Sequence, residues 1–198
     1  MRRARALTLA LLVLPAGSFL TSCGSDTTAI TAEPLCPSAG RGAGNGTILM
    51  AQSVPTATWI PCIRSALPLG WSFHHLDARN GDARFWLDSD RDGTMAVEIR
   101  LEASCTTTGA TEVPSDREGL RRLERVARTS PSYAGERYYV YEGGCVTVAF
   151  SLDGGNAGEA LALASQVIGV VSRDDLRTQV HDASGGRLSL DPPPHENG

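Results

Sequence analysis

The 198-residue sequence contains no lysine, because all 18 of its basic residues are arginines. This absence excludes each chemistry that needs a lysine side chain, namely Schiff-base catalysis, a Ser–Lys dyad and the lysine of a P-loop. The chain also has no CxxC pair and no GxSxG elbow. Zinc binding, thioredoxin-like chemistry and serine hydrolysis of that type therefore have little support from the sequence.

The sequence also lacks an apolar run of the roughly 20 residues that a membrane-spanning helix needs. Its main apolar run, from Ala6 to Leu14, is followed at once by Pro15. Arg2, Arg3 and Arg5 precede this run. A positive start followed by a short apolar stretch is typical of a secretory signal, which we predict over residues 1–22.

The predicted signal ends in a short motif, Leu20-Thr21-Ser22-Cys23, which resembles the lipobox of bacterial lipoproteins. The resemblance implies that cleavage before Cys23 makes this residue the new N-terminus and that its sulfur carries a diacylglycerol. Two acyl chains anchor a protein stably where one does not. The implied location is the extracytoplasmic face of the cell membrane, with the membrane as the partner of the anchor. Beyond Cys23 the sequence resembles no family whose function can be named.

The charge balance argues against nucleic acid as a partner. Removing the signal takes away three arginines and no acidic residue, so 15 basic residues face 22 acidic ones and the mature chain carries a net charge of −7. Nucleic-acid binding depends on an excess of basic side chains that neutralise phosphates. Hydrophobic residues at 41% and charged residues at 20% are values of an ordinary globular chain.

Four cysteines remain after Cys23, namely Cys36, Cys62, Cys105 and Cys145. An even number in an exported chain predicts two disulfides, for which three connectivities exist. We favour Cys105–Cys145, because each of these residues adjoins a predicted strand and antiparallel neighbours bring such ends together. Cys36–Cys62 is then the remaining pair.

Composition divides the mature chain into a flexible tether over residues 23–46, a single globular domain over residues 47–190 and a disordered tail over residues 191–198. Alternating or β-rich segments predict strands over residues 71–76, 84–87, 95–101, 137–141 and 145–152, with tight turns at residues 79–82 and 142–144. Helical signals predict helices from residue 115, over residues 157–171 and from residue 172 to Gly185-Gly186. The fold class is α+β, an antiparallel sheet of about five strands with helices packed on it and disulfides joining the elements.

The segment Asp88-Ser89-Asp90-Arg91-Asp92-Gly93 suggests a metal site. Asp88, Asp90 and Asp92 at alternate positions before a glycine match the first half of an EF-hand calcium loop. The twelfth position is Ile99 instead of a bidentate glutamate, and the flanks are predicted strands. The favoured alternative is a polar hairpin turn, so we predict little effect of calcium and no required cofactor.

Two further clusters have simple structural explanations. His74-His75 with Asp77 could bind a metal, but neighbouring residues on an ideal strand point to opposite faces. An arginine stripe would run along the helix predicted from residue 115, where neighbouring glutamates, Glu118 and Glu124, neutralise part of it. Its members are Arg117, Arg121, Arg125 and Arg128.

The sequence thus favours a membrane-anchored, non-enzymatic binding or interaction module of the cell envelope, whose ligand or partner protein is unknown. The alternatives are an envelope hydrolase and a weak calcium-binding module. No catalytic residue is predicted. A concave pocket with converging histidine or carboxylate groups would favour the hydrolase.

Overall fold

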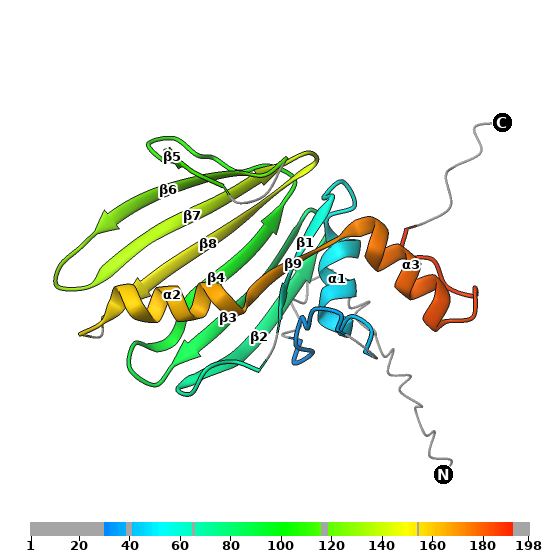
Figure 1. Ribbon diagram of the computed structural model, residues 1–198, viewed down its shortest axis with the longest axis horizontal. Coiled ribbons are helices and arrows are strands. Elements are labelled where there is room, and N and C mark those ends of the chain that lie inside the picture. Colours follow the sequence, from blue (N-terminus) through cyan, green and yellow to red (C-terminus); the bar gives the residue numbers. More distant parts are fainter. Residues whose placement is uncertain (1–29, 39–40, 65, 116–118, 154, 192–198) are drawn as a thin grey trace, which may run out of the picture.

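The computed structural model describes residues 30–38, 41–64, 66–115, 119–153 and 155–191 (Figure 1). The predicted signal, Cys23 and residues 192–198 of the predicted tail lie outside the described residues. None of the helices in the described ranges is long and apolar enough to span a membrane.

The main element is an antiparallel sheet with the strand order β2-β3-β4-β8-β7-β6-β5, and β1 and β9 form a separate two-stranded ribbon. The nine described strands exceed the five or so predicted, while the antiparallel α+β class is confirmed. The strands are β1 Trp59–Ile63, β2 Trp71–Arg79, β3 Asp82–Ser89, β4 Gly93–Glu102, β5 Thr111–Val113, β6 Arg121–Arg128, β7 Tyr133–Tyr141, β8 Gly144–Leu152 and β9 Ile168–Ser172. The helices are α1 Asn45–Ser53, α2 Ala157–Val167 and α3 Arg173–Ala183.

The core lies on one face of the large sheet. Residues of β3, β4 and β8 that are paired across the strands, such as Phe85, Ile99 and Val148, are almost completely buried there. Helices α1 and α2 and the β1–β9 ribbon lie over this face, and α3 extends beyond the end of the ribbon (Figure 1). Alternation of buried and exposed residues along the strands separates this covered face from an outer face rich in charged side chains.

Both predicted hairpins are confirmed. In the first, β2 and β3 are joined by Asn80-Gly81, where only Gly81 adopts a positive φ, of 85°. In the second, β7 and β8 are joined by Glu142-Gly143. Gly143 also has a positive φ, and a Cβ there would collide with the carbonyl oxygen of Thr56. Only glycine satisfies both conditions.

The helix predicted from residue 115 is wrong, because residues 121–128 form strand β6. Residues 116–118 of the predicted capping box lie outside the described residues. The leucine and arginine spacing that resembles a helix also fits a strand, since Leu123 packs on one face while Arg122 and Glu124 point to the other. Pairing with β7 along nearly the whole strand overrides the local helical preference.

The helix predicted over residues 157–171 is correct only as far as Val167. Residues 168–172 instead form β9, which pairs with β1 residue by residue. This segment contains three β-branched residues, which favour an extended backbone once a partner strand is available. The next helix begins as predicted, because the Ser172 side chain accepts a hydrogen bond from the Asp175 N–H, and Gly185 and Gly186 follow its end with positive φ.

Within the segment predicted as a tether, the structure describes residues 30–38 and 41–46, and some of them pair with strands of the domain. Ile30 pairs with Leu76, and Leu35 pairs with Ile63. Helix α1 then begins at Asn45, before the predicted domain boundary. The predicted tail also begins too early, because Asp191 forms ion pairs with Arg173 and Arg177.

Candidate functional site

A cavity of about 360 Å³ lies where the covered face of the sheet meets α2 and β9. We call it the arginine pocket, because three arginines from separate segments line it. Its lining residues are Arg64, Leu120, Arg122, Arg137, Tyr139, Val146, Val148, Ser165, Gln166, Ile168, Gly169 and Val170. A volume of this size is typical of small-molecule binding sites.

The strand register explains why polar side chains occur on this part of the core face. Arg122 of β6 pairs with Tyr139 of β7, which pairs with Val146 of β8. Across the same face, β3 and β4 carry large buried apolar side chains. The face therefore changes from apolar to cationic toward β6, beside α2 and β9.

Arg137 is held from two sides. Its Nε lies 3.0 Å from Oε1 of Glu124 on the neighbouring strand, and its Nη1 donates a 2.8 Å hydrogen bond to Oγ of Ser165 on α2. The same Glu124 carboxylate also pairs with Arg122. The Arg137 side chain is only 18% exposed, so its guanidinium has little freedom to move.

Arg64 differs from the other two arginines. It is exposed, and no described residue forms an ion pair with its guanidinium. Its side chain lies across Gly169, where an added Cβ would be 2.5 Å from its Cγ and 2.6 Å from its Nε. The absence of a side chain on Gly169 thus provides the surface on which Arg64 rests.

Arg64 brings to this pocket a guanidinium that has no ion pair among the described residues, so the described part of the pocket carries positive charge. The chain as a whole has a net charge of −4. None of the described residues lining the pocket is a histidine, cysteine, aspartate or glutamate. The site is therefore built from hydrogen-bond donors and apolar walls, an arrangement suited to holding a ligand.

No pattern in the sequence predicts Arg64, Arg122 or Arg137 as site residues. They lie on three segments separated by many residues, and no spacing rule connects them. The one relevant signal was the exclusive use of arginine, which indicates no position. Only the pairing of β6 with β7 and the placement of β9 bring the three together.

The structure places the predicted calcium ligands in a hairpin turn between β3 and β4. Asp88 accepts a 2.7 Å hydrogen bond from the Met95 N–H, and Asp92 accepts one of 2.7 Å from the Ser89 hydroxyl. Asp90 lies beside Gly70. Within the described ranges, no group of three or more His, Cys, Asp or Glu residues is arranged to hold a metal ion. Calcium binding by this turn stays a prediction.

His74 is exposed and His75 is half-buried, but the two side chains do not point to opposite faces as they would on an ideal strand. A shift of register between Phe73 and Leu76 interrupts the strand, and the rings of His74 and His75 lie 4.8 Å apart. His74 Nδ1 is 2.9 Å from Asp88 Oδ2, while His75 stacks on Trp86 with ring centroids 4.3 Å apart. Both rings therefore contact neighbouring side chains of the sheet.

Two of the described arginines of the predicted stripe, Arg121 and Arg125, have carboxylate partners. Arg117 and Glu118 lie outside the described residues. Arg121 pairs with Glu112 at 2.7 Å, and Arg125 pairs with Glu136, both on the outer face of the sheet. Glu124 lies on the opposite face, where it binds the pocket arginines.

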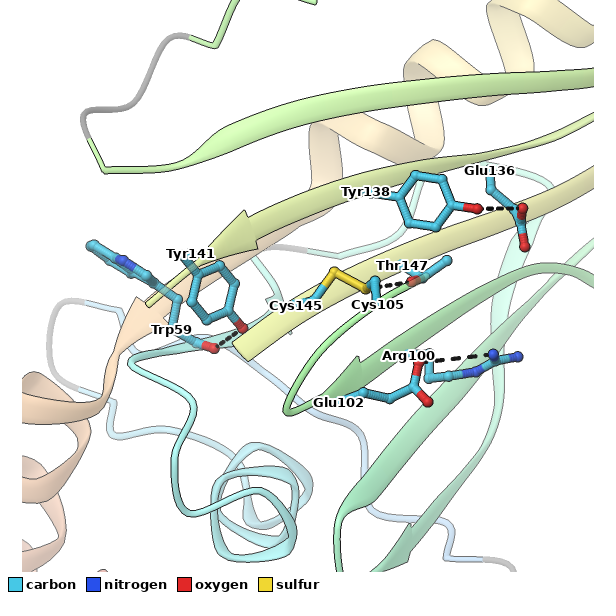
Figure 2. Close-up of a disulfide and its surroundings, with 9 residues drawn as sticks. All are labelled: Trp59, Arg100, Glu102, Cys105, Glu136, Tyr138, Tyr141, Cys145 and Thr147. Carbon is cyan, nitrogen blue, oxygen red and sulfur yellow. Dashed lines mark hydrogen bonds and ion pairs between the residues drawn. A yellow bond between two sulfur atoms is a disulfide. The ribbon is translucent and has the colours of Figure 1, made fainter. Parts of the chain in front are cut away.

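Both favoured disulfides are confirmed, with Cα–Cα distances of 4.9 Å for Cys36–Cys62 and 5.7 Å for Cys105–Cys145. Figure 2 shows the second disulfide beside Thr147, whose Oγ1 lies 3.1 Å from Cys105 Sγ. Nearby, the Tyr138 hydroxyl donates a 2.6 Å hydrogen bond to Glu136. Burial and this carboxylate raise the pKa of Tyr138 to about 12, so it remains a neutral donor.

No family model matches this chain, and the searches of curated proteins and of solved structures found no match. Arguments about its function consequently start from the arginine pocket, the disulfides and the N-terminal motif.

Proposed function

We propose that this protein is a lipid-anchored lipoprotein on the extracytoplasmic face of the cell membrane, where it acts as a non-enzymatic binding module of the envelope. The ligand occupies the arginine pocket. The observation that carries the binding proposal is the convergence of Arg64, Arg122 and Arg137 with apolar walls in one cavity of about 360 Å³.

The two disulfides support the proposed location. Disulfides form and persist in oxidising compartments and are rare in reducing ones. Both join segments that belong to the folded part of the chain. An exported protein would keep them, which agrees with the signal and lipobox motif at residues 1–23.

The anchoring proposal predicts that Cys23→Ala abolishes attachment of lipid, because the thiol that accepts the diacylglycerol is gone. Metabolic labelling with an alkyne fatty acid, followed by gel detection, measures the attachment. The double variant Cys36→Ala/Cys62→Ala is the control: it also removes cysteine sulfurs but leaves the lipobox unchanged, so its labelling is expected to persist. Labelling that survives in Cys23→Ala would show that the lipobox interpretation is wrong.

The binding proposal predicts that a bulky side chain in the pocket displaces the ligand. Ser165 lines the pocket from α2, whereas Ala162 lies on the exposed side of the same helix. Protein is isolated from its own membrane, and small molecules that co-purify are identified by native mass spectrometry. We expect one such molecule with the wild type and with Ala162→Trp, and a loss of at least about tenfold in its occupancy with Ser165→Trp.

Circular dichroism would verify that both tryptophan variants remain folded. Equal amounts of bound molecule in the folded Ser165→Trp and Ala162→Trp proteins would rule out the arginine pocket as the binding site.

A further inference from the structure

We infer that the ligand of the arginine pocket is a small amphipathic anion, with a carboxylate or phosphate group held by the arginines and an apolar body packed on the sheet. This inference rests on the proposed function and assigns the chemical class of the ligand. It follows from the charge of the pocket, its donor geometry and its apolar floor.

Glu124 pairs with both Arg122 and Arg137. Arg64 adds a third positive charge, with no ion-pair partner among the described residues. Cations on the outer face, such as Arg121 and Arg125, have carboxylates of their own. An anionic ligand would supply in the pocket the counter-charge that the outer face already has.

The donor geometry favours a carboxylate or phosphate. A guanidinium is planar and presents its N–H groups as a fork that matches two oxygens of such an acid. Arg137 is positioned in advance by Glu124 and by its 2.8 Å hydrogen bond to Ser165. Arg64 is exposed and supported by Gly169, so it can approach a ligand without breaking an ion pair within the described structure. A preorganised donor and an exposed one therefore line the same cavity and together can hold an acid group.

The apolar part of the lining explains why a bare anion is not the preferred ligand. Tyr139, Ile168 and Val170 are partly exposed and present apolar surface to the pocket, while Val146 and Val148 lie buried behind them. Burying an apolar ligand surface on them is favourable by about 25 cal/mol per Å². A ligand with both an acid group and a short hydrocarbon body therefore uses the whole cavity.

The test compares three ligands that have the same eight-carbon chain, namely octyl phosphate, octanoate and octanol. Isothermal titration calorimetry measures the affinity of each ligand for the full chain carrying Cys23→Ala. Every ligand is kept below its critical micelle concentration. We expect both acids to bind at least about tenfold more tightly than octanol, since hydrogen bonds between charged groups contribute about that much. Raising the salt concentration should weaken binding of the acids but not of octanol.

Arg64→Gln is the decisive variant, because Arg64 is exposed and its loss should leave the fold intact. It should weaken octyl phosphate binding about tenfold and leave octanol binding unchanged. Arg128→Gln is the matched control, since it removes the same charge from an exposed position of β6 outside the pocket. It should change neither affinity.

Each contrary result has a distinct meaning. Octanol binding as tightly as the acids, or equal effects of Arg64→Gln and Arg128→Gln, would overturn the anionic class while leaving the pocket as a binding site. Inorganic phosphate binding as tightly as octyl phosphate would overturn the amphipathic class. No binding by any of these probes would also overturn the inference, whereas the proposed function is judged separately by the Ser165→Trp experiment.

The acid group could belong to a membrane lipid or to a free organic acid, and co-sedimentation with vesicles separates these sources. Phosphatidylglycerol vesicles are compared with phosphatidylcholine vesicles, using the Cys23→Ala chain with and without Arg64→Gln. Both proteins carry the same N-terminal segment, so their difference reports the pocket. Retention on phosphatidylglycerol that depends on Arg64 assigns a lipid headgroup, and binding of octyl phosphate without such retention assigns a free acid.

Discussion

At the scale of single residues, Arg173 has the most demanding position in the described structure. It is 7% exposed, and its guanidinium donates four hydrogen bonds to other residues of the fold. Its Nε donates to the carbonyl of Ala57 and its Nη2 to the carbonyls of Ala51 and Val54, each at 2.7 Å. Its Nη1 pairs with Asp191 at 2.7 Å. One guanidinium thus ties the end of α1 to the segment that leads into β1 and to the C-terminal segment.

We predict that Arg173→Met lowers the free energy of unfolding by about 3–5 kcal/mol, because it leaves buried carbonyls without a donor and a carboxylate without its partner. Urea unfolding followed by circular dichroism measures the change. The control is Arg177→Met, which breaks another ion pair to Asp191 from a side chain that is 47% exposed. An exposed pair contributes at most about 1 kcal/mol. Similar losses for both variants would contradict this account of Arg173.

At the scale of elements, the Cys105–Cys145 disulfide holds the segment between β4 and β6 on the outer face of the sheet. The two cysteines are 40 residues apart, and the loop between them includes β5, β6 and β7. Leu123, Tyr138 and Cys145 form a small buried cluster there, against which Cys105 and Ala110 pack. This cluster is separate from the main core, and the disulfide joins the segment around Cys105 to it.

We predict that the double variant Cys105→Ser/Cys145→Ser lowers the free energy of unfolding by about 4 kcal/mol, the loop-entropy value for a closed loop of this length. Hydrogen exchange with mass spectrometry should show faster exchange over residues 103–113. The control Cys36→Ser/Cys62→Ser removes the other disulfide and should instead speed exchange over residues 30–38. Unchanged exchange over residues 103–113 in the first variant would argue against this role.

Local sequence signals were reliable where an element is determined by neighbours along the chain. The turn at Asn80-Gly81 and the cap at Ser172 depend on one or two residues, and both occur as predicted. The signals failed at β6 and β9, where the local residue pattern predicts a helix. These two segments gain more from pairing with β7 and β1 than from their own helical preference.

At the scale of the whole molecule, the two faces of the large sheet differ in how their charged side chains are paired. On the outer face, Arg84 and Arg100 both lie near the carboxylate of Glu98, and Arg100 also lies 3.9 Å from Glu102. At the arginine pocket on the covered face, Arg64 has no ion pair among the described residues. A solvated ladder of pairs contributes solubility and little binding specificity. The pocket, partly shielded from water by α2 and β9, is where a charge has a larger effect on a ligand.

The amino-acid sequence by itself determined the antiparallel hairpins and the starts of the two helices after residue 156, because each depends on local turn geometry or capping. It favoured one pairing of the cysteines out of three, and the structure has that pairing. Only the tertiary structure decided that residues 121–128 and 168–172 are strands: β6 joins the large sheet through β7, and the partner of β9, β1, is distant in the chain. It also decided the arginine pocket. Arg122 and Arg137 face the cavity from the neighbouring strands β6 and β7, and the long-range pairing of β1 with β9 brings Arg64 to it. Such a long-range pairing leaves no periodic trace in the sequence.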